Sequence, residues 1–269
     1  MNQSRLGKKM TSEKSFGRDF SILLEHLCQG KPFAFNRFSD GELYILQDKE
    51  LILGEEVVKI GEKVEGSQYQ KEDHKHFDPD AHAFYRDRLV DSFRYCAEGY
   101  YKGLSCRCCV GQEHFQWQLD FLKGYDENLT WANLLLNANY PRFIRQMLPL
   151  FNQYPVVFIC NEKADLSMLP FVVKDFRVGY NAMINDYALI NDMIEWVAKS
   201  RIRGHLFLFS ASSFSKMAIH QLYEAHPCNT YIDVGTTMNV FMAMRLDRTY
   251  LRSYWLKQKG KDLEKTCIW

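Results

Sequence analysis

"HLFLFSASSFSKMAIHQLYEAHPCNTYIDVG", residues 205–235, is the stretch of the sequence that decides the fold. HLFLFS predicts a buried strand, and NTYIDVG predicts another. Between them, ASSFSKMAIHQLYEAH has apolar residues at helical spacing and predicts a helix. Nearly all-apolar strands that alternate with helices are typical of a parallel sheet covered by helices on both faces.

The same alternation extends over the rest of the chain. Further strands are predicted at 32–38, 103–111, 155–160 and 176–180, and further helices at 16–29, 79–99, 113–125, 131–154 and 185–201. We therefore predict an α/β fold of Rossmann-like type, with a mostly parallel sheet and helices on both faces. In such a sheet a ligand lies at the carboxyl ends of the strands, where the strand-to-helix loops gather.

The pattern divides the chain into three parts. We predict an N-terminal tail and helix at 1–30, a single α/β domain at 31–250 and a C-terminal tail at 251–269. Within the domain, residues 54–80 are charged, contain glycine and show no sustained period. Long excursions of this kind are typical of functional loops, and we predict a mobile loop that closes over the ligand.

Composition restricts the class of protein. Of the 269 residues, 46% are hydrophobic and 25% are charged, and the formal net charge is +1. These values are ordinary for a globular protein, and the small net charge gives no indication of a nucleic-acid partner. The N-terminal stretch has no apolar signal segment, and no segment reaches the ~18 apolar residues of a membrane span. We therefore expect a cytoplasmic protein without a transmembrane segment.

The eight cysteines are expected to be thiols, because a cytoplasmic protein rarely keeps disulfides. Three of them, Cys106, Cys108 and Cys109, lie in "SCRCCVG". A zinc site would call for a C-x-x-C knuckle together with a second pair, and the sequence does not offer that combination. Alternation along a buried strand is the simpler interpretation. The histidines of "HKHFDPDAH", residues 74–82, are interpreted as solvated loop residues.

Two acidic residues follow the first predicted strand of the domain, in "FSDGE". If the chain is extended there, the Asp40 and Glu42 carboxylates point the same way and offer the oxygen ligands that Mg²⁺ and Mn²⁺ prefer. Gly41 would allow a ligand to approach closely, and Arg37 would bind phosphate. Alternatively, Ser39 and Glu42 form the capping box of a helix. The two interpretations are compatible, because a helix N-terminus also binds phosphate.

A second loop of interest joins the strand and the helix of the opening stretch. Ser210, Ser212 and Ser213 surround the start of the predicted helix, and Lys216 lies one turn further along. Backbone N–H groups and hydroxyls at a helix N-terminus can hold a pyrophosphate, although serines also simply cap helices. The loop has no GxGxxG and no GK[ST], so the dinucleotide and P-loop fingerprints are missing.

Acidic residues follow two further strands. Asp233 precedes Gly235 and Thr236, and it could bind a ribose hydroxyl, a sugar hydroxyl or a metal, or cap the next segment. Glu162 and Asp165 follow the buried strand "VVFIC". Because the carboxyl ends of parallel strands meet at one edge of a sheet, we expect these loops to lie beside "FSDGE".

"FNRFSDGEL" is similar to the R-[FY]-[GS]-D-G-E stretch of the GT-D fold glycosyltransferases, a family formerly described as a domain of unknown function. Residues 205–239 resemble that family's strand, small-residue loop, helix and "IDIG" segment. The two matches lie at the ends of a region from 33 to 241, whose middle matches only in the order of its elements. Thr236, Thr237 and Asn239 stand where the family often has a histidine and an acid, and the loop has Ala-Ser-Ser where Gly-Pro is frequent.

The resemblance implies an enzyme that transfers a hexosyl or pentosyl group from a nucleotide-diphosphate sugar, a UDP-sugar by preference, to a glycan or glycoprotein acceptor. It places Asp40 and Glu42 on a Mn²⁺ or Mg²⁺ ion bound to the donor diphosphate, and Asp233 on a sugar or ribose hydroxyl. An inverting mechanism needs a catalytic base, for which Asp233, Glu162 and Asp165 are the candidates. The residues expected at the donor phosphates are Arg37, Ser39, Gly41, Ser210, Ser212, Ser213, Lys216, Gly235 and Thr236.

Two other classes of protein remain open. A methyltransferase or dehydrogenase would have a similar sheet, but the sequence lacks the glycine-rich first turn of a dinucleotide-binding fold. A non-catalytic glycan-binding α/β domain would not need the two acids of "SDGE", which are present. Binding of S-adenosylmethionine or NAD would favour the first alternative, and glycan binding that is indifferent to metal and nucleotide would favour the second.

Overall fold

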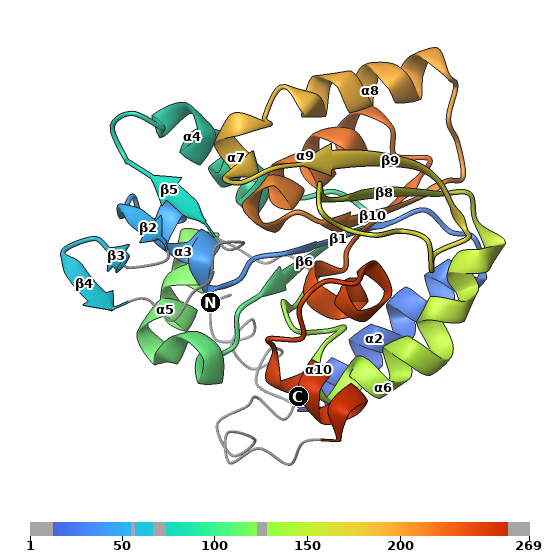
Figure 1. Ribbon diagram of the computed structural model, residues 1–269, viewed down its shortest axis with the longest axis horizontal. Coiled ribbons are helices and arrows are strands. Elements are labelled where there is room, and N and C mark those ends of the chain that lie inside the picture. The colour runs from blue at the N-terminus through green and yellow to red at the C-terminus, as the bar shows by residue number, and fades with distance from the viewer. Residues whose placement is uncertain (1–12, 55–56, 67–73, 123–127, 258–269) are drawn as a thin grey trace.

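The computed structural model describes residues 13–54, 57–66, 74–122 and 128–257, which form two sheets with surrounding helices (Figure 1). The strands of the large sheet are β1 (Ala34–Arg37), β6 (Tyr100–Leu104), β7 (Leu129–Trp131), β8 (Val156–Asn161), β9 (Val172–Val178), β10 (Leu206–Ser210) and β11 (Thr230–Asp233). The small sheet contains β2 (Leu51–Leu53), β3 (Val57–Ile60), β4 (Lys63–Gly66) and β5 (Lys75–Phe77).

Helices connect and cover the strands. The α-helices are α2 (Glu13–Cys28), α3 (Asp40–Leu46), α4 (Ala83–Arg94), α5 (Arg107–Phe121), α6 (Tyr140–Arg142), α7 (Ala182–Asn185), α8 (Leu189–Lys199), α9 (Ser212–Ala225) and α10 (Thr249–Leu256). Other helical turns are η2 (Asn137–Asn139), η3 (Phe143–Met147), η4 (Leu148–Gln153) and η5 (Gly235–Met242).

The large sheet has the strand order β7-β6-β1-β11-β10-β8-β9, and every neighbouring pair of strands is parallel. β8 and β10 consist almost entirely of buried apolar residues, as expected of a sheet that is covered on both faces. The register pairs Phe209 of β10 with Asp233 of β11, so neighbouring strands end at nearly the same level. The predicted α/β class with a parallel sheet is confirmed.

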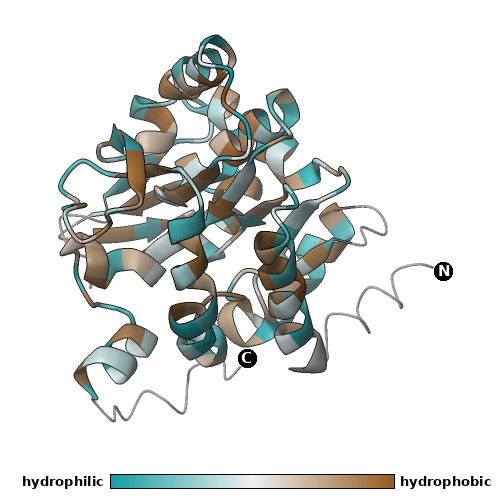
Figure 2. Ribbon diagram, turned by 90° about the vertical axis from the view of Figure 1, so that its right-hand side faces the viewer, coloured by the Kyte–Doolittle hydropathy of each residue, from teal (hydrophilic) through white to brown (hydrophobic). Residues whose placement is uncertain are grey.

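Helices lie on both sides of this sheet (Figure 1). α4, α7, α8 and α9 lie on one side, and α2, α6 and α10 lie on the other. In Figure 2 the central strands are mostly coloured as hydrophobic, whereas the outlying helices alternate between hydrophilic and hydrophobic residues. Amphipathic helices of this kind bury one stripe against the sheet. No helix in the described part of the chain is long and apolar enough to cross a membrane.

The terminal helices belong to the same hydrophobic core as the sheet. Phe20 of α2 and Leu251 of α10 are fully buried in that core. Trp255 of α10 also donates a hydrogen bond from its indole Nε1 to the Tyr140 hydroxyl at 2.8 Å. The described residues of the predicted N-terminal and C-terminal parts are therefore packed into the central domain rather than lying apart from it. The outer ends of both parts lie outside the described residues.

The segment 54–80, which the sequence predicts as a loop, contains three strands of the small sheet. This sheet is antiparallel with the order β4-β3-β2-β5, and Leu51 is in register with Ile60 on one side and Phe77 on the other. Leu51 and Phe77 are each 1% exposed, so one face of the sheet is packed against the domain. Strands of three or four residues are too short to show a period, which explains why the sequence did not reveal them. Residues 55–56 and 67–73 of the segment lie outside the described residues.

The strand predicted at 103–111 is wrong beyond Leu104. The strand ends there because the Gln118 side chain binds both the amide N–H and the carbonyl of Ser105, each at 3.0 Å. The helix α5 follows, with a kink at Gly111, whose φ of +79° lies in the left-handed region. The cysteines of this segment therefore lie on a helical turn and do not alternate along a strand.

The helix predicted at 131–154 begins later than expected. The first residues of that stretch continue from β7, and helical backbone starts at Asn137. Pro141 lies in the first turn of α6, where its missing N–H would have no intrahelical partner. The proline therefore lies at the start of this helix.

Candidate functional site

Polar residues end three neighbouring strands at the carboxyl edge of the large sheet. β1 ends at Arg37, β10 ends at Ser210 and β11, which lies between them, ends at Asp233. All three residues lie at one edge because the strands are parallel, as the sequence predicts. Arg37 is 8% exposed and Asp233 is 1% exposed, so both charged side chains are enclosed by protein.

Glu42 lies in the first turn of α3, shortly after β1. Its Oε2 accepts a hydrogen bond from the Ser39 amide at 2.9 Å, and its Oε1 accepts one from the Ser213 hydroxyl at 2.7 Å. The Lys75 ammonium is 3.6 Å from Oε1. Burial raises the pKa of Glu42, but Lys75, Lys216 and the two hydrogen bonds outweigh burial and lower the pKa to about 2. The buried side chain is therefore a carboxylate at neutral pH.

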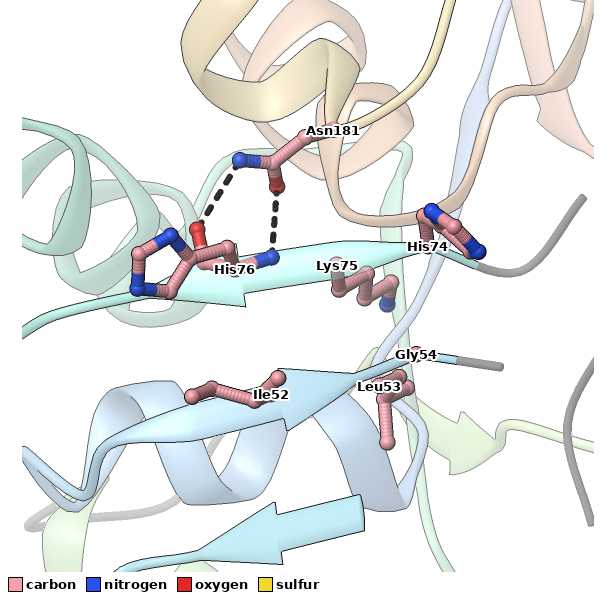
Figure 3. Close-up of a pocket in the computed structure, with 7 residues that line it drawn as sticks. All are labelled: Ile52, Leu53, Gly54, His74, Lys75, His76 and Asn181. Atoms are coloured by element: carbon pink, nitrogen blue, oxygen red, sulfur yellow. Dashed lines mark hydrogen bonds between the residues drawn. The ribbon is translucent and has the colours of Figure 1, made fainter. Parts of the chain in front are cut away.

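Lys75 brings the small sheet into this site. It lies on β5, and its ammonium donates a hydrogen bond to the Ser213 hydroxyl at 3.1 Å. The Asn181 side chain fixes the strand, because its Oδ1 accepts from the His76 amide at 3.3 Å and its Nδ2 donates to the His76 carbonyl at 2.9 Å (Figure 3). A pocket of about 270 Å³ lies here, lined by Ile52, Leu53, Gly54, His74, Lys75, His76 and Asn181.

Lys216 and Asp233 form a buried ion pair. The Lys216 ammonium contacts Oδ2 of Asp233, and the Gly235 amide donates to Oδ1 at 3.0 Å. The carbonyl of Lys216 accepts a hydrogen bond from the Asn36 side chain at 2.9 Å. Lys216 also lowers the pKa of Glu42. Its positive charge therefore attracts both Glu42, which follows β1, and Asp233, which ends β11.

The Arg37 guanidinium packs against the backbone of Gly235. Its Nε donates to the Ala132 carbonyl, and a Cβ added at Gly235 would lie against Nη1 and 3.2 Å from Cζ. Gly235 has a φ of +51°, and its carbonyl accepts a hydrogen bond from the Ser210 hydroxyl at 2.8 Å. Glycine is therefore required here both for the turn and for the approach of the guanidinium.

We expect Gly235→Ala to lower the free energy of unfolding by about 2–3 kcal/mol, because the positive φ alone costs an alanine about 1–2 kcal/mol and the new Cβ displaces Arg37. Gly204→Ala is the matched control, since Gly204 has a φ of +66° but no atom close to its Cβ position. Urea unfolding of both variants separates the backbone cost from the side-chain contact. Equal losses of stability would mean that Arg37 moves away without cost.

Three other residues expected at the donor phosphates surround this group. Ser212 is exposed and begins α9 with a φ of +50°. The Thr236 hydroxyl lies 2.7 Å from the hydroxyl of Tyr250 on α10. Gly41 lies beside Lys75, whose Nζ would be 3.4 Å from a Cβ at that position. The structure thus places the expected phosphate-binding residues around the ends of β1, β10 and β11.

The Asp40 and Glu42 carboxylates do not converge. The extended interpretation of Asp40, Gly41 and Glu42 is wrong, because they form the first turn of α3, where residues two apart face different directions. Asp40 is exposed, and its Oδ1 accepts the Gly41 amide at 3.0 Å. Glu42 is 3% exposed and closes the predicted capping box, which is confirmed. In this geometry the two acids do not fit one shared divalent-cation site, and the cation stays a prediction.

Glu162 and Asp165 follow β8, which is the neighbour of β10, and both are exposed. Hydrogen bonds from Ser167, including its amide N–H at 2.9 Å, lower the pKa of Asp165. A carboxylate with a lowered pKa is a weaker general base. Among the contacts of the described residues, none joins Glu162 or Asp165 to Glu42 or Asp233.

Two residues of this site are missing from the sequence prediction. Lys75 was not predictable, because nothing in "HKHF" indicates that a short strand carries it to Glu42. Asn36 is fully buried and donates to the Tyr100 hydroxyl at 2.6 Å as well as to Lys216. A lone asparagine inside the apolar run "FAFNRF" is a signal that could have found it, since a buried amide needs partners.

No protein-family model and no curated protein matches the sequence. Two solved structures are similar to the chain. One is a structure of the domain of unknown function 1792, which is described as highly conserved and as having a distinct glycosyltransferase fold. The comparison gives a TM-score of 0.51 and 11% sequence identity, and it covers 80% of this chain and 76% of that chain. The other is a selenomethionine-substituted structure of domain of unknown function 1792, with a TM-score of 0.52, 11% identity and the same coverages of 80% and 76%. The chain therefore has the glycosyltransferase fold found in domain of unknown function 1792, the fold that its "FNRFSDGEL" stretch indicates.

Proposed function

We propose that the chain is a glycosyltransferase that moves a sugar from a nucleotide-diphosphate sugar, with UDP-sugars as the first choice, to a glycan or glycoprotein acceptor. One observation supports this beyond the fold. Arg37, Lys75 and Lys216 come from three separate elements to the carboxyl edge of the sheet, where the buried carboxylates are Glu42 and Asp233. The enclosed charges of Arg37, Lys216, Glu42 and Asp233 balance. The partly exposed Lys75 adds a positive charge beside the pocket, which suits an anionic ligand.

In this proposal the nucleotide diphosphate is the leaving group. Negative charge grows on it as its bond to the anomeric carbon of the sugar breaks, and donors that are already in position stabilise that charge. Lys75 offers an ammonium that is partly exposed beside the pocket, and Ser212 lies at the start of α9, where backbone N–H groups favour anions. The pocket between the small sheet and Asn181 is the proposed place of the donor.

A catalytic base is required only if the sugar is transferred with inversion. Of the three acids considered, Asp233 is paired with Lys216, and the pKa of Asp165 is lowered. The ion pair occupies the Asp233 carboxylate, and the lowered pKa makes Asp165 a weaker base. Glu162, exposed at the end of β8, is therefore the first candidate for substitution.

The Mn²⁺ or Mg²⁺ ion stays an expectation within this proposal. Asp40 carries the exposed carboxylate that a hard cation would reach first. If EDTA abolishes sugar transfer and Asp40→Asn abolishes it too, a divalent cation neutralises the charge of the leaving diphosphate. Transfer that survives EDTA would assign it to Arg37, Lys75 and Lys216.

We expect a nucleoside diphosphate to raise the melting temperature of the protein, because a ligand present at one hundred times its dissociation constant adds ~2.7 kcal/mol of stability. Lys75→Met should weaken this binding about tenfold or more, since a hydrogen bond to a charged group contributes ~1.5–3 kcal/mol. Lys59→Met is the matched control, because Lys59 lies on the same small sheet but pairs with Glu50. Thermal unfolding with UDP, GDP, CDP and ADP, in Mn²⁺ and in EDTA, measures both effects.

Other outcomes of this experiment would contradict the proposal. Protection by S-adenosylmethionine or NAD, without protection by any nucleoside diphosphate, would indicate another class of nucleotide-binding enzyme. Protection by oligosaccharides alone would indicate a glycan-binding domain. If Lys75→Met and Lys59→Met weaken nucleoside diphosphate binding equally, the donor does not bind in the pocket beside Lys75.

A further inference from the structure

Cys106, Cys108 and Cys109 bring their thiols together directly after β6. The Cys106 Sγ lies 3.0 Å from the Cys108 Sγ and 3.3 Å from the Cys109 Sγ, and all three sulfur atoms lie within 4.8 Å of one another. Cys106 is 2% exposed, whereas Cys108 and Cys109 are at the surface. In the described part of the chain, no other set of three histidine, cysteine or acidic side chains comes this close together.

The backbone, not the order of residues alone, produces this convergence. On a strand, Cys106 and Cys108 would point to one face of the sheet and Cys109 to the other. The chain instead forms a helical turn, in which the Cys106 carbonyl accepts the amide N–H groups of Cys109 at 3.0 Å and Val110 at 3.1 Å. In the sequence, Cys106 and Cys109 have the C-x-x-C spacing that is common among thiolate ligands of one metal ion, and the turn brings their sulfur atoms to 3.3 Å.

The turn is fixed at its base. Ser105 is clamped by the buried Gln118 side chain, and its hydroxyl donates to the Phe38 carbonyl at 2.9 Å. At the other end, Gly111 with its positive φ separates the turn from the rest of α5. The three thiols are therefore presented together by a segment that needs little rearrangement to bind a ligand.

Three thiolates around one point are the donor set of a soft metal ion. Zn²⁺ binds thiolate sulfur at about 2.3 Å in tetrahedral geometry, so two thiolates on one ion lie about 3.8 Å apart. The three sulfur atoms already lie within 4.8 Å of one another. Cys108 and Cys109 are exposed, so their side chains can rotate to the sulfur–sulfur separation that the ion requires. Calcium, magnesium and manganese prefer oxygen ligands and do not suit this set.

We propose that Cys106, Cys108 and Cys109 form a binding site for a thiophilic divalent cation, with Zn²⁺ as the physiological candidate. The three thiolates are the protein ligands, and the fourth tetrahedral position faces solvent, because two of the three cysteines are at the surface. Binding releases the thiol protons to solvent, so affinity falls as the pH is lowered. The site uses none of the residues expected at the donor or at the Mn²⁺ or Mg²⁺ ion.

The test uses the reduced full chain, freed of metal with a chelator and titrated with Co²⁺ under inert gas. Thiolate-to-cobalt charge-transfer absorption is expected to saturate at one Co²⁺ per chain and to disappear when Zn²⁺ displaces the cobalt. Cys108→Ser and Cys109→Ser should each weaken binding by at least about tenfold, because even changes to the groups that hydrogen-bond to metal ligands cost about 10–100-fold. Both cysteines are exposed, so the serine variants should keep the urea midpoint of the parent protein.

The matched control is the triple variant of the exposed cysteines elsewhere in the described residues, Cys28→Ser, Cys96→Ser and Cys228→Ser, which should bind Co²⁺ as the parent does. The proposal is overturned if stoichiometric Co²⁺ gives no charge-transfer band, or if the band is unchanged in Cys108→Ser and Cys109→Ser. A disulfide among the three cysteines in protein purified under reducing conditions would overturn it as well.

Discussion

Lys216→Ala is expected to lower the free energy of unfolding by about 3–5 kcal/mol. Lys216 and Asp233 are 4% and 1% exposed, and their charged groups are in contact. Without the ammonium, the Asp233 carboxylate stays buried and keeps, among its contacts with described residues, only the hydrogen bond from the Gly235 amide. A buried charge whose partner has been removed is strongly destabilising, because the protein interior supplies neither a new opposite charge nor the water that would solvate it. Urea unfolding at neutral pH measures the loss.

A double variant distinguishes a buried ion pair from simple packing. Lys216→Met combined with Asp233→Asn removes both charges and keeps the oxygen that accepts the Gly235 amide. It should recover more than half of the stability lost in Lys216→Ala, since replacing a whole buried pair by neutral groups is often close to neutral. Lys199→Ala breaks an exposed ion pair with Glu195 and should change stability little. If Lys216→Met alone recovers as much stability as the double variant, side-chain volume and not charge accounts for the loss in Lys216→Ala.

The ion pair also explains how the site is held together. Lys216 lies on α9, Asp233 ends β11, and Glu42 follows β1, so a single ammonium acts on acids from two strands of the parallel sheet. Ser213, three residues earlier on α9, binds Glu42 directly. Helix α9 thus fixes the loops after both strands through charge and hydrogen bonds. A change in Lys216 is therefore expected to alter the positions of both acids.

Much of the fold was predictable because the local sequence carries its pattern. The buried strand "VVFIC" is a short apolar run rich in β-branched and aromatic residues, and the stretch at 205–235 changes from such a run to helical spacing and back. Their order then requires a parallel sheet with its ligand-binding loops at one edge. The placement of Arg37, Ser210 and Asp233 at that edge follows from topology alone, without any knowledge of side-chain contacts.

The remaining features of the site depend on contacts between distant segments. Lys75 reaches Glu42 only because four short strands form a separate sheet, and runs of three or four residues carry no period of their own. "SDGE" satisfied both an extended and a helical interpretation, and hydrogen bonding of Glu42 to Ser39 and Ser213 favours the helix. The turn of cysteines after β6 was hidden in the same way, because Gln118 ends the strand from a position further along the chain.

Glu42→Gln is expected to lower the free energy of unfolding at neutral pH by about 2–3 kcal/mol. The pKa of Glu42 is lowered from 4.5 to about 2, and a difference of this size between folded and unfolded chains corresponds to about 3 kcal/mol. Glutamine keeps the shape of the side chain but not the charge that faces Lys75 and Lys216. Urea unfolding in EDTA, which prevents any cation from taking part, measures the difference between the two proteins.

The pH dependence of this difference identifies its cause. Because the folded-state pKa of Glu42 is below its unfolded value, the extra stability is fully present above pH 4.5 and is lost as the pH falls toward 2. The parent protein and Glu42→Gln should therefore converge in stability between pH 4.5 and pH 2. Glu195→Gln, at the exposed pair with Lys199, should show little difference from the parent at neutral pH. A loss in Glu42→Gln that stays constant across this range would mean that its hydrogen bonds, and not its charge, hold α3 against α9.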